Sequence, residues 1–208
     1  MIRATLLVAI ALSACATSTQ SARTLPVGKT EVTLQLNRSS DGEDNDDAIW
    51  GGDLMVRRGL VERFDLGLHL ARTPGYGNTM STIAVDPKVE LTPLSSQTTV
   101  SIGVPIGILF EESDGDYHRT GTIIVPTLYV GQRVSATTEL VIAPKLFVLL
   151  PREATDDNEV YIGGSLGVRL TDPHRHWAIH PELGFARITE GEQSETVVTL
   201  GLGLAVGN

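Results

Sequence analysis

The sequence is poor in cysteine, in aromatic residues and in positive charge, and it contains no long hydrophobic run. A single cysteine among 208 residues excludes an internal disulfide and any multi-cysteine zinc or iron–sulfur site. The 16 Lys and Arg residues against 25 Asp and Glu residues give a net charge of −9, which excludes a nucleic-acid binder that relies on a basic face. The apolar run over residues 4–12 is shorter than the roughly 20 residues that a transmembrane helix needs. A chain of 208 residues allows one domain or a single small barrel.

The first residues have the features of a secretory signal peptide: one positive charge, a short apolar core and small residues after it. Residues 12–15, Leu-Ser-Ala-Cys, resemble the bacterial lipobox, which implies that Cys15 becomes the lipid-modified first residue of the mature protein. Ala16, which follows the cysteine, points by the same resemblance to the outer membrane, with the anchor on its periplasmic side. The alternative is an ordinary signal peptide cleaved after Ala16, because residues 14–16 also fit the A-x-A pattern.

Beyond the signal, apolar and polar residues alternate with a period of two, which is typical of β-strands. The alternating stretches are residues 30–37, 64–71, 83–91, 100–110, 160–170, 177–187 and 198–206, and residues 50–56 alternate with glycine. Residues 123–130 and 140–150 are more uniformly apolar. The pattern predicts an all-β chain: an antiparallel up-and-down (meander) β-barrel of about ten strands. We therefore divide the chain into a signal peptide (1–14), a lipidated tether (15–27) and the barrel domain (28–208).

The polar half of this alternation carries charges of both signs, which we expect to face the barrel lumen and pair there. These positions are Glu31, Asp53, Arg57, Asp65, His69, Asp86, Lys88, Glu90, Glu139, Lys145, Arg169, His180 and Glu182. Aromatic residues of the apolar half lie near predicted strand ends, as in the interfacial girdles of membrane barrels. They are Trp50, Phe64, Phe110, Trp177 and Phe185. We therefore expect the apolar face to meet lipid. The alternative is a soluble, lipid-anchored periplasmic barrel whose apolar face binds a ligand inside.

The predicted connections alternate between short joins and longer segments that carry most of the acidic residues. Long loops at one end and short turns at the other are typical of outer-membrane barrels, so acidic loops are expected on the extracellular side. Five prolines fall inside predicted strands: Pro87, Pro105, Pro126, Pro144 and Pro181. Four of them, Pro87, Pro126, Pro144 and Pro181, have an aliphatic residue two positions before and two positions after the proline. This repeated pattern suggests a regular structural feature such as a β-bulge.

Candidate chemistry is sparse. His180 and Glu182 would face the lumen two residues apart and could act in acid–base catalysis, with Ser101 and Ser165 as inward serines, but no G-x-S-x-G motif is present. His174 and His176 have the spacing of two metal ligands without a third, and residues 41–47 are dense in carboxylates without the EF-hand order. We expect no cofactor, no metal site and no catalytic residue, with an outer-membrane lipid hydrolase as an alternative.

Two sequence segments, residues 22–31 and 58–67, resemble segments of uncharacterised Gram-negative outer-membrane β-barrel proteins. The resemblance implies the fold and the compartment, and it brings no catalytic residues. Taken together, the sequence predicts an outer-membrane barrel lipoprotein with a structural or narrow-pore role. Its expected partners are outer-membrane lipid and, at the acidic loops, divalent cations, with no nucleic acid.

Overall fold

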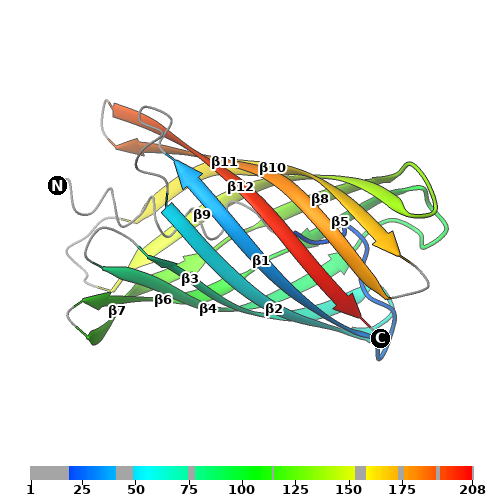
Figure 1. The fold of residues 1–208 in the computed structure, drawn as a ribbon, viewed down its shortest axis with the longest axis horizontal. Helices are drawn as coiled ribbons and strands as arrows, with labels where there is room; N and C mark the ends of the chain where they lie inside the picture. Colours follow the sequence, from blue (N-terminus) through cyan, green and yellow to red (C-terminus); the bar gives the residue numbers. More distant parts are fainter. Residues whose placement is uncertain are drawn as a thin grey trace.

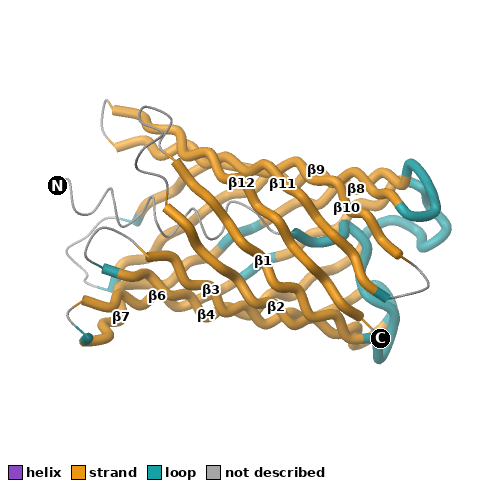
Figure 2. Tube along the Cα trace, viewed as in Figure 1, coloured by secondary structure: helices purple, strands orange, loops and turns teal. Residues whose placement is uncertain are grey.

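The computed structural model describes residues 19–40, 49–74, 78–113, 115–152, 158–172, 176–190 and 193–207. All elements in this part of the chain are strands (Figures 1 and 2). Their bounds are β1 Thr30–Ser40, β2 Ile49–Val61, β3 Phe64–Pro74, β4 Thr79–Glu90, β5 Thr98–Gly103, β6 Ile106–Ser113, β7 Asp116–Ile124, β8 Thr127–Arg133, β9 Thr138–Pro151, β10 Glu159–Asp172, β11 Trp177–Glu190 and β12 Gln193–Gly207. Among the residues described, no helix is long and apolar enough to cross a membrane.

The strands close into an antiparallel barrel of ten positions, which confirms the fold predicted from the alternation. Sequence neighbours pair around the ring, and β1 closes it against β12, with Leu34 opposite Leu204. Two of the ten strand positions around the ring are each formed by two short strands in succession. β5 and β6 both pair with β4, and β7 and β8 both pair with β9. We call the end at which β1 begins and β12 ends the base, and the opposite end the rim (Figure 1).

Prolines explain why two strands are divided. Pro105 lies between β5 and β6, and Pro126 lies between β7 and β8. The register is nevertheless the same on both sides of the break, since Lys88 pairs with Gly103 and Val85 pairs with Ile106. These two prolines therefore remove a ladder donor without adding a residue. The register is also unshifted at Pro87, Pro144 and Pro181, so the bulge expected at these three and at Pro126 is wrong. The register shifts recorded in the described strands lie elsewhere, at residues 59–61 and 109–110.

The outer face of the barrel is apolar. Leu34, Leu66, Leu68 and Leu204 all lie on the outside, with between 37% and 54% of their surface exposed. Their neighbours in the alternation, such as Asp65 and Thr33, are buried inside. The aromatic residues Trp50 and Phe185 are also exposed on the outer face. The direction of the alternation is therefore apolar outward, as the sequence predicts.

The connections differ from the expected pattern of short turns and long loops. At the rim, β6 and β7 form one tight hairpin and β11 and β12 form another, because the ladder continues through stretches expected to be loops (Figure 1). Glu111, Glu112 and Glu190 consequently lie in strands. Tyr, Thr and Ile residues in these stretches favour extended backbone, which accounts for the longer strands. The expected acidic loop at residues 41–47 lies outside the described residues.

The lumen has two unlike halves. From mid-barrel to the base it holds the charged side chains, whereas the rim half contains an apolar cluster beside buried neutral polar residues such as Ser39, Thr73 and Thr199. This cluster consists of Met80, Leu109, Ile123, Val125, Phe147, Tyr161, Ala186 and Val197. It was not expected, because the lumen was predicted to be polar throughout. The uniformly apolar stretches 123–130 and 140–150 supply Ile123, Val125 and Phe147, which face inward while their neighbours face outward.

Candidate functional site

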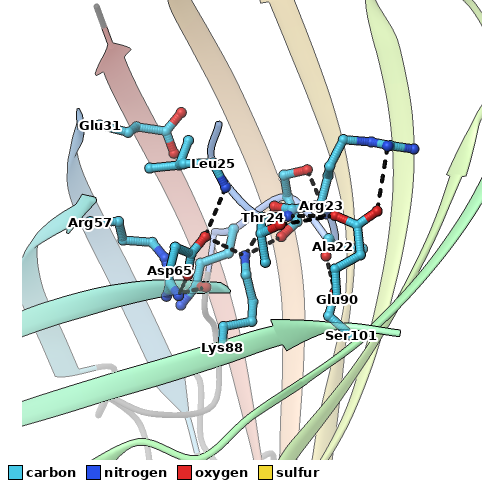
Figure 3. Close-up of polar contacts among 12 residues, drawn as sticks. Ala22, Arg23, Thr24, Leu25, Glu31, Arg57, Asp65, Lys88, Glu90 and Ser101 are labelled. Atoms are coloured by element: carbon cyan, nitrogen blue, oxygen red, sulfur yellow. Dashed lines mark hydrogen bonds and ion pairs between the residues drawn. The ribbon is translucent and has the colours of Figure 1, made fainter. Parts of the chain in front are cut away.

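The most distinctive feature of the lumen is the chain segment that precedes β1. Residues 19–27 are called the inner segment: residues 19–25 lie within the barrel, and the exposed Pro26 and Val27 lead toward β1 at the base (Figures 1 and 3). Thr19, Gln20, Ala22 and Thr24 are almost completely buried. This differs from the expectation of a tether outside the barrel over residues 15–27. Cys15, the expected lipidation site, lies outside the described residues.

The middle of the barrel holds the first residues of the inner segment. The backbone N–H of Thr19 donates to Glu182 at 2.5 Å, and its hydroxyl donates to Gln35 at 2.8 Å. Gln20 donates to Asp86 at 3.0 Å and accepts from Arg57 at 2.6 Å. The segment is therefore bound by side chains from opposite sides of the ring.

Nearer the base, charged side chains satisfy the backbone of the inner segment (Figure 3). Lys88 Nζ donates to the carbonyl oxygens of Ser21 and Arg23 at 3.0 and 3.2 Å. Glu90 accepts from both the backbone N–H and the hydroxyl of Thr24, each at 3.0 Å. Because the segment has no neighbouring strand along most of its length, its buried polar groups need such partners.

Two further contacts continue this pattern. Asp65 accepts from the Leu25 N–H at 2.9 Å, and the Ser101 hydroxyl donates to the Ala22 carbonyl oxygen (Figure 3). The inner segment is thus held mainly by ionic and polar side chains of the wall, and Ala22 also packs in a small buried apolar cluster with Tyr129, Val141 and Ala143.

The same wall residues also pair with each other. Arg57 contacts Asp65 and lies 2.5 Å from Asp86, while Lys88 lies 3.8 Å from Asp65. His69 lies between two carboxylates, 3.3 Å from Asp53 and 3.2 Å from Asp86.

The other predicted lumen residues are arranged around this centre. Arg169 pairs with Glu31, and Glu139 accepts from the Ser21 hydroxyl at 2.7 Å. Lys145 and His180 are buried on the inward set, and His180 lies against Gly167. All thirteen predicted side chains therefore belong to inward positions, and most of them contact one another or the inner segment.

Glycines of the wall provide the space for the inner segment. A Cβ atom built on Gly203 would lie 2.6 Å from Thr19 Cβ, and one on Gly131 would lie 2.6 Å from Ala22 Cβ. A Cβ on Gly59 would overlap the carbonyl oxygens of Leu25 and Pro26. Sequence reasoning missed this seat, although the alternation over residues 198–206 places Gly203 on the inward set; Gly131 lies outside the stretches predicted as strands. The sequence feature that could have indicated it is a glycine at an inward position of the alternation, where a polar side chain is expected.

Two of the residues considered for catalysis contact the inner segment, whereas both ring nitrogens of His180 are buried without a hydrogen-bond partner among the described residues. Glu182 accepts from Thr19, and Ser101 donates to Ala22, so both face the inner segment. No group of three or more potential metal ligands occurs within the described ranges, which include His176 but not His174 or residues 41–47.

Two cavities adjoin the inner segment. One of about 40 Å³ lies between the charged and apolar halves of the lumen and is lined by Gln20, His69, Pro105, Ile123 and Tyr129, among others. The other, of about 180 Å³, lies near the base and is lined by polar residues that include Ser21 and Arg23.

Comparison with known proteins places this architecture among membrane barrels. No protein-family model and no curated protein matches the sequence significantly. The translocator domain of the autotransporter NalP from Neisseria meningitidis is similar in structure, with a TM-score of 0.50 and 10% identity over 99% of this chain and 94% of that one. An outer-membrane channel from Pseudomonas putida F1 has a TM-score of 0.48 and 11% identity over 92% of this chain and 100% of the other. At such identities the likeness shows the fold: a closed β-barrel of the kind found in Gram-negative outer-membrane proteins.

Proposed function

We propose that this protein is an outer-membrane β-barrel that forms a narrow channel closed by its own inner segment, without catalytic activity. The observation that carries the proposal is the seat of residues 19–25, which occupy the base half of the lumen and contact wall residues from Gln35 on β1 to Glu182 on β11. The apolar outer face supports insertion into a bilayer, because a lipid-facing surface must be apolar while the paired charges lie inside. The same face argues against the soluble alternative, which requires apolar residues on the inside.

A closure built from polar contacts can be released. Most hydrogen bonds to the inner segment have one charged partner, and each of these contributes about 1.5–3 kcal/mol net, since water can replace either partner. Within the described residues, the segment is joined covalently to the barrel only at its C-terminal end, where it leads into β1. Its departure would leave a polar wall in the base half, and passage would then be limited by the apolar cluster near the rim.

Locking the inner segment in its seat tests this closure. In a Cys15→Ala background, Ala22→Cys and Gly131→Cys place two thiols next to each other, since a Cβ on Gly131 lies 2.6 Å from Ala22 Cβ. A shift of about 1 Å brings them to the spacing of a disulfide, roughly 3.5–4.5 Å between Cβ atoms. In planar bilayers we expect the oxidised protein to remain closed and reduction to restore brief openings.

The matched controls are the two single cysteine variants, which cannot form the lock. Equal conductance before and after reduction of the double variant, with the disulfide verified by mass, would contradict a closing role for the segment. A barrel that stays closed in every form would favour the purely structural role.

Lipidation at Cys15 is a separate part of the proposal and rests on the lipobox-like residues 12–15. Cys15→Ala should abolish incorporation of labelled palmitate in cells, because the chain has no other cysteine. The protein should still fractionate with the outer membrane, since the barrel itself is embedded. Labelling that persists in the variant would refute the anchor, and cleavage after Ala16 would then be detected at the mature N-terminus by mass spectrometry.

A further inference from the structure

His180 of β11 is a buried ionisable side chain to which the proposed channel gives no role. It is 2% exposed, and neither of its ring nitrogens has a hydrogen-bond partner among the described residues. The three other histidines within the described ranges differ from it. His118 and His176 are exposed, and His69 lies between two carboxylates. His180 is therefore the histidine on which a proton would meet neither water nor a bonded carboxylate in the closed barrel.

The ring of His180 lies where the inner segment is seated. Across the β11–β12 ladder His180 is opposite Gly203, the glycine against which Thr19 packs. On its other side, a Cβ atom built on Gly167 of β10 would overlap His180 Nε2. Two residues further along β11, Glu182 accepts from the Thr19 N–H at 2.5 Å. The wall and the seated segment therefore bury the ring together.

Three charged side chains act on His180: Glu182 of its own strand, Arg169 of β10 and Glu31 of β1. Both carboxylates are already engaged, because Glu182 holds the Thr19 N–H and Glu31 pairs with Arg169. Residues 196–207 of β12 and residues 19–22 of the inner segment contain no ionisable side chain. A charged His180 in the closed barrel would thus have to take a carboxylate from an existing contact.

We propose that His180 makes closure of the channel sensitive to pH, because its protonation favours release of the inner segment. The inference rests on the proposed closure by this segment. If Glu182 turns to the charged ring, it leaves the Thr19 N–H. If the segment departs, water enters this part of the lumen and hydrates the charged ring. Protons therefore bind the released state better than the seated state. The closed form is stable above the titration range of a hydrated histidine and loses stability as the pH falls through it.

Labelling of a cysteine at position 22 by a water-soluble maleimide measures release directly. The full chain is used in detergent micelles, with Cys15→Ala and Ala22→Cys. Ala22 is completely buried when the segment is seated, whereas Val27 is 61% exposed, so Val27→Cys is the matched reference. The ratio of the two labelling rates removes the effect of pH on the thiol itself. Since a histidine in water titrates near pH 6.5, the ratio should rise about tenfold between pH 7.5 and pH 5.5.

His180→Gln removes the proton acceptor and should keep the labelling ratio constant over the same pH range. His180→Phe keeps a planar ring without ionisable nitrogens and should give the same result, and heat-modified mobility on gels verifies that each variant forms the barrel. His118→Gln is the matched control, because His118 is exposed at the rim. This control should retain the full tenfold rise.

An equal rise in the parent protein and in His180→Gln would overturn the proposal and assign the response to carboxylates of the lumen. A parent protein whose labelling ratio is constant from pH 7.5 to pH 5.5 would overturn it as well. Conductance in planar bilayers, measured on the same acidification, separates the two proposals. A rise in labelling that depends on His180 and leaves the conductance unchanged would support the pH response and reject the closing role of the segment.

Discussion

Deletion of residues 19–25 should convert the barrel into an open, cation-selective channel. The deletion removes the contacts with Glu182, Asp86, Lys88, Glu90 and Asp65 and leaves the strands intact. The thirteen predicted lumen positions then present seven carboxylates against four Lys and Arg side chains. Such an excess of carboxylates around a narrow pore favours cations.

The measurement is single-channel conductance in planar bilayers, with the reversal potential in a salt gradient as the readout of selectivity. The intact chain should be closed most of the time, and the deleted chain should conduct steadily with a preference for potassium over chloride. A steady current with anion preference would contradict the assignment of the lumen charges. A deleted chain that folds by heat-modified mobility but stays closed would show that the apolar cluster, and not the inner segment, closes the lumen.

A point substitution reaches the same question without shortening the chain. Gly203→Val places a branched side chain where Thr19 lies, since even a Cβ at this position would be 2.6 Å from Thr19 Cβ. Overpacking of this size costs about 1–3 kcal/mol, so the fraction of open channels should rise roughly tenfold. Gly207→Val is the control, because a Cβ there meets its nearest atom, the Thr30 carbonyl oxygen, at 3.4 Å and no residue of the inner segment.

The fold was predictable because a strand that separates lipid from a polar lumen leaves a period of two in the sequence. Leu66 and Leu68 on the outside, with Asp65 inside, follow from that period alone. The period specifies which face a side chain occupies, and it cannot specify what fills the enclosed space. The inward positions of Ile123 and Phe147 were therefore hidden within stretches that are apolar on both faces.

The inner segment escaped prediction for a related reason. Residues 19–24 are small or polar and show no period, which is the appearance of a solvated linker. In the barrel the same small side chains fit against Gly131 and Gly203, and their backbone is satisfied by Lys88 and Glu90 from distant strands. Partners so far apart in the chain leave no local signal.

Replacement of Arg57 by methionine should cause the largest loss of stability of any single substitution in the lumen. Arg57 is 2% exposed and contacts Asp65, Asp86 and the Gln20 side chain at once. Its removal takes the closest cation from two buried carboxylates. Their remaining charged partners are Lys88, 3.8 Å from Asp65, and His69, 3.2 Å from Asp86. Breaking a buried ion pair by removal of one partner typically costs about 3–5 kcal/mol.

Urea-induced unfolding from lipid vesicles, followed by the fluorescence of Trp50 and Trp177, measures this loss. The neighbouring residue provides the control, because Arg58 is exposed on the outer face and Arg58→Met should change the free energy of unfolding by less than about 1 kcal/mol. Adding Asp65→Asn and Asp86→Asn to Arg57→Met should recover much of the loss, since it removes the unpaired charges that cause the penalty. If Arg57→Met and Arg58→Met destabilise equally, the charges around Arg57 are hydrated rather than paired. The closure of the lumen by the inner segment would then need another source of specificity, because Gln20 would have lost its anchor on the wall.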